Sequence, residues 1–179
     1  MTILESERLL FRSHRPSDLD AFCAIEADGE VRRYIGGAPR TREAAERKFR
    51  DVHLKGAGRK LALQAVIYKA DSRYIGYCGL YPNFRPDGSA IDGEASLGFT
   101  FAREFWGRGL ATEAGRAFVR FGFDELHLAR IVATAEIDNA ASLRVLEKLG
   151  FVRVGSDYGT RSFHRLELLN PKSGSPSKL

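Results

Sequence analysis

Two glycines, Gly107 and Gly109, separate an apolar, strand-like stretch from an amphipathic helical pattern. The stretch covers residues 94–101, and the helical pattern begins at Leu110, with apolar residues recurring at helical spacing. Glycines let the backbone approach a ligand closely, and the unpaired amides at a helix start favour phosphate. The segment therefore predicts a strand–loop–helix unit that binds a phosphorylated cofactor.

The spacing around these glycines excludes two common phosphate-binding motifs. A P-loop needs Gly-Lys-Ser/Thr after its turn, and no lysine follows here. The dinucleotide fingerprint needs a third glycine or an alanine three positions after the second glycine, where this chain has Thr112. The predicted cofactor therefore belongs to another class.

The run from Phe105 to Ala114 resembles the pyrophosphate loop of the GNAT superfamily of N-acetyltransferases, whose members bind acetyl-CoA. It has the long form Trp-Gly-x-Gly-x-Ala-Thr-Glu-Ala, although Glu104 stands where the family most often has Gln or Arg. Two further segments, 6–19 and 139–151, resemble the branch that includes ribosomal-protein N-terminal acetyltransferases. The motifs occur in the family's order and cover nearly the whole chain.

The remaining pattern predicts alternating helices and strands. Thr41 is a helix N-cap, Gly150 ends a helix that starts at Asn139, and residues 82–93 form a polar loop. We expect strands over residues 9–14, 61–68, 74–81, 94–101, 130–136, 151–158 and 162–169, and helices starting near residues 17, 30, 41, 110 and 139. This order predicts an α/β class. The resemblance implies the GNAT fold: a central mixed, mostly antiparallel sheet, splayed between two parallel strands and flanked by helices.

Length and composition limit the function classes. The 179 residues predict one domain over residues 1–170, followed by a polar, Pro/Ser-rich tail over 171–179 that we expect to be disordered. No apolar run reaches membrane-spanning length, and the N-terminus lacks a signal-peptide profile. Cys23 and Cys78 lie far apart without a metal-binding pattern, which favours free thiols in the cytoplasm and no metal. The charge of +5 is spread along the chain, and no arginine-rich block favours nucleic acid.

The resemblance implies which residues bind acetyl-CoA. The backbone amides of the loop face the pyrophosphate, and the Arg108 side chain adds a charged contact. Phe99, Thr100 and Phe101 offer backbone groups to the pantetheine arm, although their side chains also fit a core role. Asn139 contacts the pantetheine arm, is a helix N-cap, or does both. The loop residues in this set are Gly107, Arg108, Gly109, Ala111 and Thr112.

Two residues are candidates for proton transfer. Many relatives use a tyrosine one turn after the position of Ser142, but this chain has Leu146 there. Ser142 or a water molecule must then protonate the leaving thiolate. Many relatives have a glutamate at the position of Ser96. Strand alternation places Glu94 on the same face, so it is a candidate base through water or else a solvent-exposed strand-end residue.

The acceptor site is the least specified part of the sequence. By resemblance, Tyr34, Arg85 and Asp92 border the site of a peptide or small-molecule amine. The resemblance also allows a homodimer. The leading hypothesis is an acetyl-CoA-dependent N-acetyltransferase acting by direct attack in a ternary complex. The alternative is a non-catalytic acyl-CoA-binding regulatory module, motivated by Leu146 and Ser96.

Overall fold

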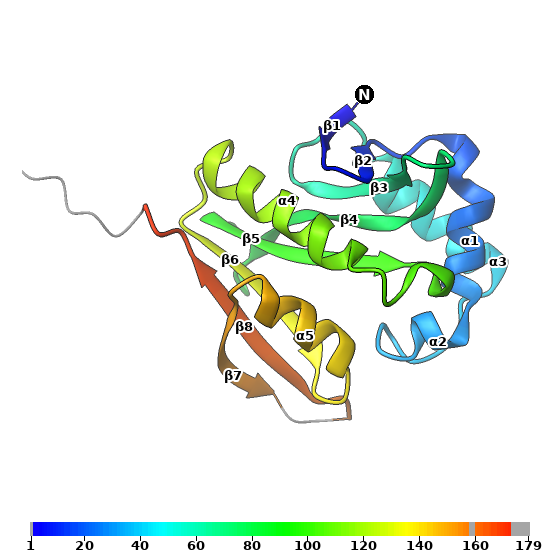
Figure 1. The fold of residues 1–179 in the computed structure, drawn as a ribbon. Helices are drawn as coiled ribbons and strands as arrows, with labels where there is room; N and C mark the ends of the chain where they lie inside the picture. Colours follow the sequence, from blue (N-terminus) through cyan, green and yellow to red (C-terminus); the bar gives the residue numbers. More distant parts are fainter. Residues whose placement is uncertain (1, 158–159, 173–179) are drawn as a thin grey trace, which may run out of the picture.

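The computed structural model describes residues 2–157 and 160–172, which form eight strands in one sheet with helices on both faces (Figure 1). The strands are β1 (Thr2–Glu5), β2 (Leu9–Arg12), β3 (Ala62–Tyr68), β4 (Arg73–Phe84), β5 (Ala90–Phe101), β6 (Arg130–Glu136), β7 (Val152–Asp157) and β8 (Phe163–Leu169). The α-helices are α1 (Leu19–Ala27), α2 (Gly29–Arg32), α3 (Arg42–Lys48), α4 (Leu110–Asp124) and α5 (Ala140–Lys148). Short 3₁₀ turns cover Pro16–Asp18 and Arg103–Phe105, and a π-helical turn over Phe49–Leu54 continues α3.

The sheet runs in the order β1-β2-β3-β4-β5-β6-β8-β7 and is antiparallel except for the β5–β6 pair. That parallel pair is short, because only residues 94–96 of β5 pair with residues 130–132 of β6. Beyond Ser96 the two strands have no further paired residues in the described structure, although both continue to residues 101 and 136. The sheet is therefore splayed at its centre, which confirms the predicted fold class.

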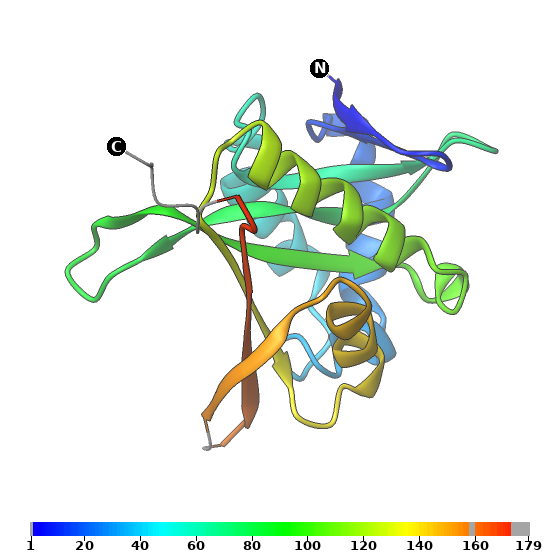
Figure 2. The ribbon, with the colours of Figure 1, turned by 60° about the vertical axis from the view of Figure 1, so that its left-hand side comes forward.

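The helices lie on opposite faces of the sheet, as Figures 1 and 2 show. Two hydrophobic clusters hold them there. α4 and α5 cover one face, where Phe118 of α4 packs edge-on against Phe11 of β2. α1 and α3 cover the β2–β4 half of the other face through a smaller cluster that includes Phe22, Phe49 and Tyr77. Residues of β7 that share this second face, such as Val152, are exposed. In the described structure, α1 and α3 therefore cover the second face only over strands β2–β4, and the covered region ends beside the splay.

The segment 82–93, expected to be a loop, is instead largely strand. β4 continues to Phe84 and β5 begins at Ala90, so the two strands pair as a long hairpin that ends in a turn where Arg85 donates its amide to the Ser89 carbonyl at 2.8 Å. This hairpin projects beyond the body of the sheet (Figure 2, green). Both of its faces meet solvent, so its sequence is mostly polar and lacks the alternation that identifies a half-buried strand.

Other boundaries differ by a few residues for similar reasons. β1 was not predicted, because this four-residue edge strand is partly exposed and has no apolar alternation. β2 ends at Arg12, two residues before the expected end, and α2 is one turn long where a helix to residue 35 was expected. The expected caps are present: Thr41 accepts from the Ala44 amide, Asn139 accepts from the Ser142 amide, and Gly150 has a φ of +90°.

The ends of the expected domain and strands fall partly outside the described residues. The predicted disordered tail over 171–179 has only Pro171 and Lys172 within them, and Lys172 forms an ion pair with Asp124. Tyr158, the predicted end of the strand now described as β7, is also outside the described residues. No helix among the described residues is long and apolar enough to cross a membrane.

Candidate active site

The loop between β5 and α4 has the geometry of an anion site. Gly107 and Gly109 have φ angles of +74° and +77°, a region that side-chain-bearing residues rarely adopt. Gly109 is the N-cap of α4, and no side chain of the described residues caps this 15-residue helix. The first amides of α4 are therefore left without intrahelical or capping partners, and the positive end of the helix dipole is directed at the loop.

Two distant parts of the sequence meet behind this loop. Glu113, in the first turn of α4, accepts from the Ser6 hydroxyl (2.8 Å), the Arg8 amide (2.8 Å) and Arg8 Nε (2.7 Å). Arg8 also donates from Nη1 to the Arg108 carbonyl in the loop itself, at 3.1 Å. Partial burial opposes ionisation of Glu113, but these donors outweigh it and keep its pKa below the ordinary value. We call this contact the Arg8–Glu113 brace, and it holds the loop against the sheet edge.

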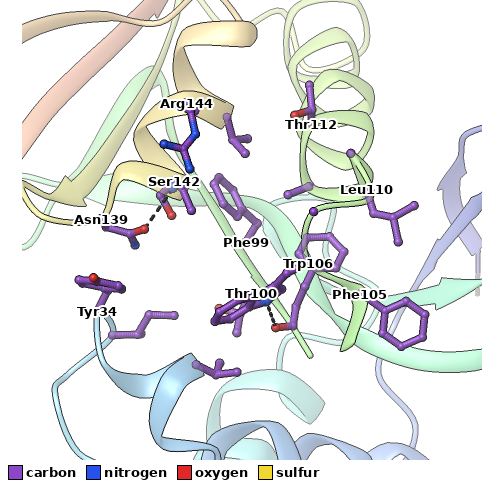
Figure 3. Close-up of a pocket in the computed structure, with 18 of the residues that line it drawn as sticks. Tyr34, Phe99, Thr100, Phe105, Trp106, Leu110, Thr112, Asn139, Ser142 and Arg144 are labelled. Carbon is purple, nitrogen blue, oxygen red and sulfur yellow. Dashed lines mark hydrogen bonds between the residues drawn. The ribbon is translucent and has the colours of Figure 1, made fainter. Parts of the chain in front are cut away.

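The loop opens onto a cavity of about 330 Å³, which we call the loop cavity. It lies between α2, the C-terminal end of β5, the loop and α5, and its volume is typical of a ligand pocket. Figure 3 shows Tyr34 on one side, Asn139 and Ser142 at the start of α5, and Trp106 beside the loop. Of the predicted cofactor residues, all but Arg108 line it: Phe99, Thr100, Phe101, Gly107, Gly109, Ala111, Thr112, Asn139 and Ser142.

Basic side chains lie in the wall of the loop cavity and beside it. Arg144 and Lys148 lie one turn apart on α5, are exposed, and line the cavity. Arg108 lies over the Phe105 ring, with its guanidinium carbon 5.1 Å from the ring centre. The cavity wall contains one carboxylate, Glu30. The arrangement therefore suits a ligand that carries several phosphate charges.

Trp106 is partly exposed at the loop rather than buried in the core. Its side chain is 46% exposed and lines the loop cavity, while its Nε1 donates to the Phe101 carbonyl at 2.8 Å. This bond ties the loop to the end of β5, as the dashed line in Figure 3 shows. Trp106 therefore fixes the loop by a hydrogen bond and leaves its ring available to a ligand.

A second cavity, of about 440 Å³, lies across the splay on the face that α1 and α3 cover, and we call it the far cavity. Six residues line both cavities, so the two spaces meet there. They are Tyr34, Ile35, Phe99, Thr100, Asn139 and Ser142. A ligand that lies along the loop therefore reaches, through the splayed strands, a second ligand on the other side of the sheet.

Ser142 is well placed at this junction. Its backbone amide donates to Asn139 Oδ1 at 3.1 Å, which orients the first turn of α5 and leaves the serine hydroxyl free of that bond. Leu146, one turn later, is buried and lines the far cavity, so no hydroxyl is present at that position. At this end of α5, Ser142 therefore supplies a hydroxyl group to the junction, and Leu146 supplies none.

Behind the far cavity lies a buried ionic cluster around Glu26, whose side chain is fully buried. Glu26 accepts from Tyr77 (2.7 Å), Lys48 (3.0 Å) and Arg40 (2.7 Å), and Arg32 lies 3.4 Å away. Burial opposes ionisation of Glu26, but Lys48, Tyr77 and Arg32 outweigh it and lower its pKa. Lys48 and Tyr77 also line the far cavity, so this cluster forms part of its wall.

Three predicted site residues lie elsewhere. Glu94 lines neither cavity; its oxygens accept from Asn83 Nδ2 (2.8 Å) and Arg130 Nε (2.6 Å), beside the paired end of β5. Arg85 is folded onto the hairpin turn, where it donates to Ser89 and to the Ala90 carbonyl. Asp92 is exposed on the same hairpin. Of the three predicted acceptor-site residues, only Tyr34 lies at the junction. Glu94, the candidate base, is instead ion-paired with Arg130.

The residues that sequence reasoning missed are mostly charged. Arg144 and Lys148 carried a usable signal, because they follow Asn139 at helical spacing on the face that bears Ala141 and Val145. Lys48, Tyr77, Glu136 and Arg161 come from four separate elements or turns, and no local pattern connects them. Only the tertiary structure shows that they share a wall.

Comparisons with known proteins agree with this geometry. Residues 8–152 match the sequence profile of a family described as an acetyltransferase (GNAT) domain. An uncharacterized N-acetyltransferase of Bacillus licheniformis, p20, is 32% identical over 162 residues, which is 87% of this chain and 85% of that protein. A GNAT-family acetyltransferase structure from Bacillus anthracis superposes with a TM-score of 0.81 at 26% identity, covering 95% of this chain and 99% of that one. A Vibrio cholerae spermidine N-acetyltransferase, solved with CoA and spermine, shares the fold at a TM-score of 0.74 and 19% identity, covering 93% and 98%.

Proposed function

This chain belongs to the GNAT family of acetyltransferases, and from that membership we propose that it moves an acetyl group from acetyl-CoA to a primary amine by direct attack in a ternary complex. The observation that carries the proposal is the junction of the two cavities through the splayed sheet. A cofactor on one side and an acceptor on the other meet there without a covalent enzyme intermediate. Cys23 and Cys78 are buried free thiols, which supports a reducing cytoplasm as the compartment.

The loop cavity fits the cofactor in three parts. The uncapped amides of α4 and the backbone of Gly107 to Gly109 bind the pyrophosphate. Arg144 and Lys148 are placed to contact further phosphate charge. The backbone of β5 beyond Ser96, which has no strand partner on the β6 side in the described structure, offers hydrogen bonds to the amides of the pantetheine arm.

The chemistry follows from the junction. Acetyl-CoA supplies a thioester carbonyl, and the acceptor supplies a neutral amine that attacks its carbon. A backbone N–H near Phe99 stabilises the developing negative charge on the carbonyl oxygen. The C–S bond then breaks and Ser142 gives its hydroxyl proton to the leaving thiolate. The one proton lost by the amine passes through water to Ser142 and restores its hydroxyl. Glu94 has no part in this scheme, because its oxygens are held by Asn83 and Arg130.

Thermal unfolding with CoA ligands tests the cofactor assignment without knowledge of the acceptor. Acetyl-CoA or CoA at about 100 times its Kd is expected to stabilise the protein by roughly 2.7 kcal/mol, a rise in Tm of about 5–11 °C. NAD and ATP at equal concentration serve as controls. An unchanged Tm with both CoA species would remove the cofactor assignment. Acetyl-dependent thiol release with an amine panel then distinguishes the enzyme from a non-catalytic CoA-binding module.

Ser142→Ala is expected to lower kcat by about tenfold or more while leaving the affinity for CoA nearly unchanged. The substitution removes only the hydroxyl, because the bond to Asn139 comes from the backbone amide of residue 142 and survives. The measurement is steady-state kinetics beside calorimetric titration of CoA into both proteins. Equal kcat values for the two proteins would show that water alone protonates the thiolate.

A further inference from the structure

The far cavity has a wall with an excess of positive charge. Lys48 lines this cavity and forms part of the cluster in which Arg32, Arg40 and Lys48 surround the single carboxylate of Glu26. Three cations thus face one carboxylate, and Glu26 already accepts from Tyr77, Lys48 and Arg40. A fully buried group with its acceptor sites in use cannot bind a further cation from the ligand.

The remaining carboxylate on the wall is also in use. Glu136 lines the far cavity, where it is ion-paired with Arg161, which lines the cavity as well. Arg161 also donates to the Arg33 carbonyl at 3.3 Å, so the pair is anchored to the segment after α2. Among the described residues that line this cavity, no other carboxylate is present. The wall therefore offers cations without offering a free acidic group.

Of the three cations around Glu26, Lys48 is the one that lines the far cavity in the described structure. Its ammonium group has three donors, of which one reaches Glu26 at 3.0 Å and a second reaches the Tyr77 hydroxyl at 3.3 Å. Its side chain is 22% exposed and lines the cavity, whereas Arg32 is 4% exposed and lies behind it. A third donor thus remains for an anionic group in the cavity.

We propose that the acceptor is an amine that carries a carboxylate, with its amine at the junction near Ser142 and its carboxylate held by Lys48 on the far wall. The proposal rests on the acetyl-transfer function proposed above. A polyamine would bring a second positive charge toward a wall that already has an excess of it. The same excess of positive charge disfavours the ammonium form of the bound amine. Because the ammonium form cannot attack the thioester, the wall favours the reactive, neutral amine without a free carboxylate base.

A matched set of small acceptors tests this charge preference. The set comprises linear ω-amino acids of three to six carbons, their neutral amides, and diamines of equal length, each assayed with acetyl-CoA for thiol release and for the acetylated product by mass spectrometry. We expect kcat/KM for the best amino acid to exceed that of its amide and of the matching diamine by at least about tenfold. Equal values across the three classes, or a preference for the diamine, would overturn the proposal.

Lys48→Met is the variant that assigns the preference to this residue. It keeps most of the apolar stem, and Arg32, Arg40 and Tyr77 remain around Glu26. We expect the ratio of kcat/KM for the amino acid to kcat/KM for its amide to fall about tenfold in Lys48→Met, and Lys48→Arg to restore much of that ratio. The control is Lys55→Met, which removes an exposed lysine paired with Asp51 away from the cavity. A preference that persists in Lys48→Met would contradict the assignment.

The experiment separates this proposal from the proposed function. If CoA raises the Tm but no amine is acetylated, the catalytic proposal fails. The acceptor proposal is then judged by calorimetric titration of the same amino acids, amides and diamines into the CoA complex. Tighter binding of the amino acid that is lost in Lys48→Met would support it, and equal binding of the three classes would overturn it.

Discussion

Glu26→Gln is expected to lower the free energy of unfolding by about 3–5 kcal/mol, the largest stability effect of any single polar substitution considered for this chain. The carboxylate is fully buried and, among the residues that the structure describes, is the one anion paired with Arg32, Arg40 and Lys48. Glutamine keeps the shape but not the charge, so three cations would lose their counter-ion, and Arg32 is itself buried. Urea denaturation monitored by circular dichroism measures the difference.

Glu30→Gln is the matched control for this substitution. Glu30 is four residues further along, and its contact with Arg33 is 4.0 Å long between side chains that are 55% and 63% exposed. Exposed ion pairs of this kind contribute about 0–1 kcal/mol, so the same chemical change is expected to have little effect here. If the two variants lost similar stability, the Glu26 cluster would not be a buried ionic centre.

Acidification from pH 7 to pH 5 is expected to lower the free energy of unfolding by about 3 kcal/mol through two buried histidines. Burial lowers the pKa of His53 to about 2, with His14 and Lys48 adding to the effect. Burial also lowers the pKa of His14 to about 4, where Asp18 opposes the shift and Arg12 adds to it. Below the unfolded pKa of about 6.5 the unfolded chain takes up protons that these buried rings do not, so stability is complete above pH 7 and falls as the pH drops.

His53→Leu tests the source of this pH dependence. The ring of His53 packs against Phe22 and His14, at 4.8 and 4.5 Å between ring centres, and none of the described residues hydrogen-bonds either ring nitrogen. Leucine has a similar volume and cannot be protonated, so roughly half of the loss between pH 7 and pH 5 is expected to disappear. Denaturation at several pH values gives the slope. An unchanged slope would place the titrating groups elsewhere in the protein.

The cofactor side of the site was predictable from the sequence because its signals are local. The pair Gly107 and Gly109, the cap at Asn139 and the end at Gly150 each depend on backbone geometry within a few residues, and the structure has the geometry that each predicts. The family resemblance used the same segments, and the family match confirms it. Local sequence thus predicted the geometry of the loop and of the start of α5, which are two parts of the wall of the loop cavity.

The acceptor side was not predictable for the converse reason. Alternation correctly placed Glu94 and Ser96 on one face of β5, since both contact Asn83. The sequence could not show that Arg130 stands beside Glu94 in the parallel pair and occupies its carboxylate. Arg85 and Asp92 were expected at the acceptor site, but they belong to a hairpin that projects away from it. The charged wall of the far cavity, our proposed acceptor site, combines residues from α3, β4, β6 and the segment before β8, which only the folded chain brings together.

The Arg8–Glu113 brace joins residues 105 positions apart, so the cofactor loop is completed by one of the longer-range contacts in the domain. During synthesis, the turn between β1 and β2 that contains Arg8 emerges first. Its partner Glu113 on α4 is made only after more than half of the chain has been synthesised. Closing so long a segment is slow relative to forming the local turn at Gly107 and Gly109. The cofactor loop is therefore completed late in folding, when the β1–β2 turn has docked against α4.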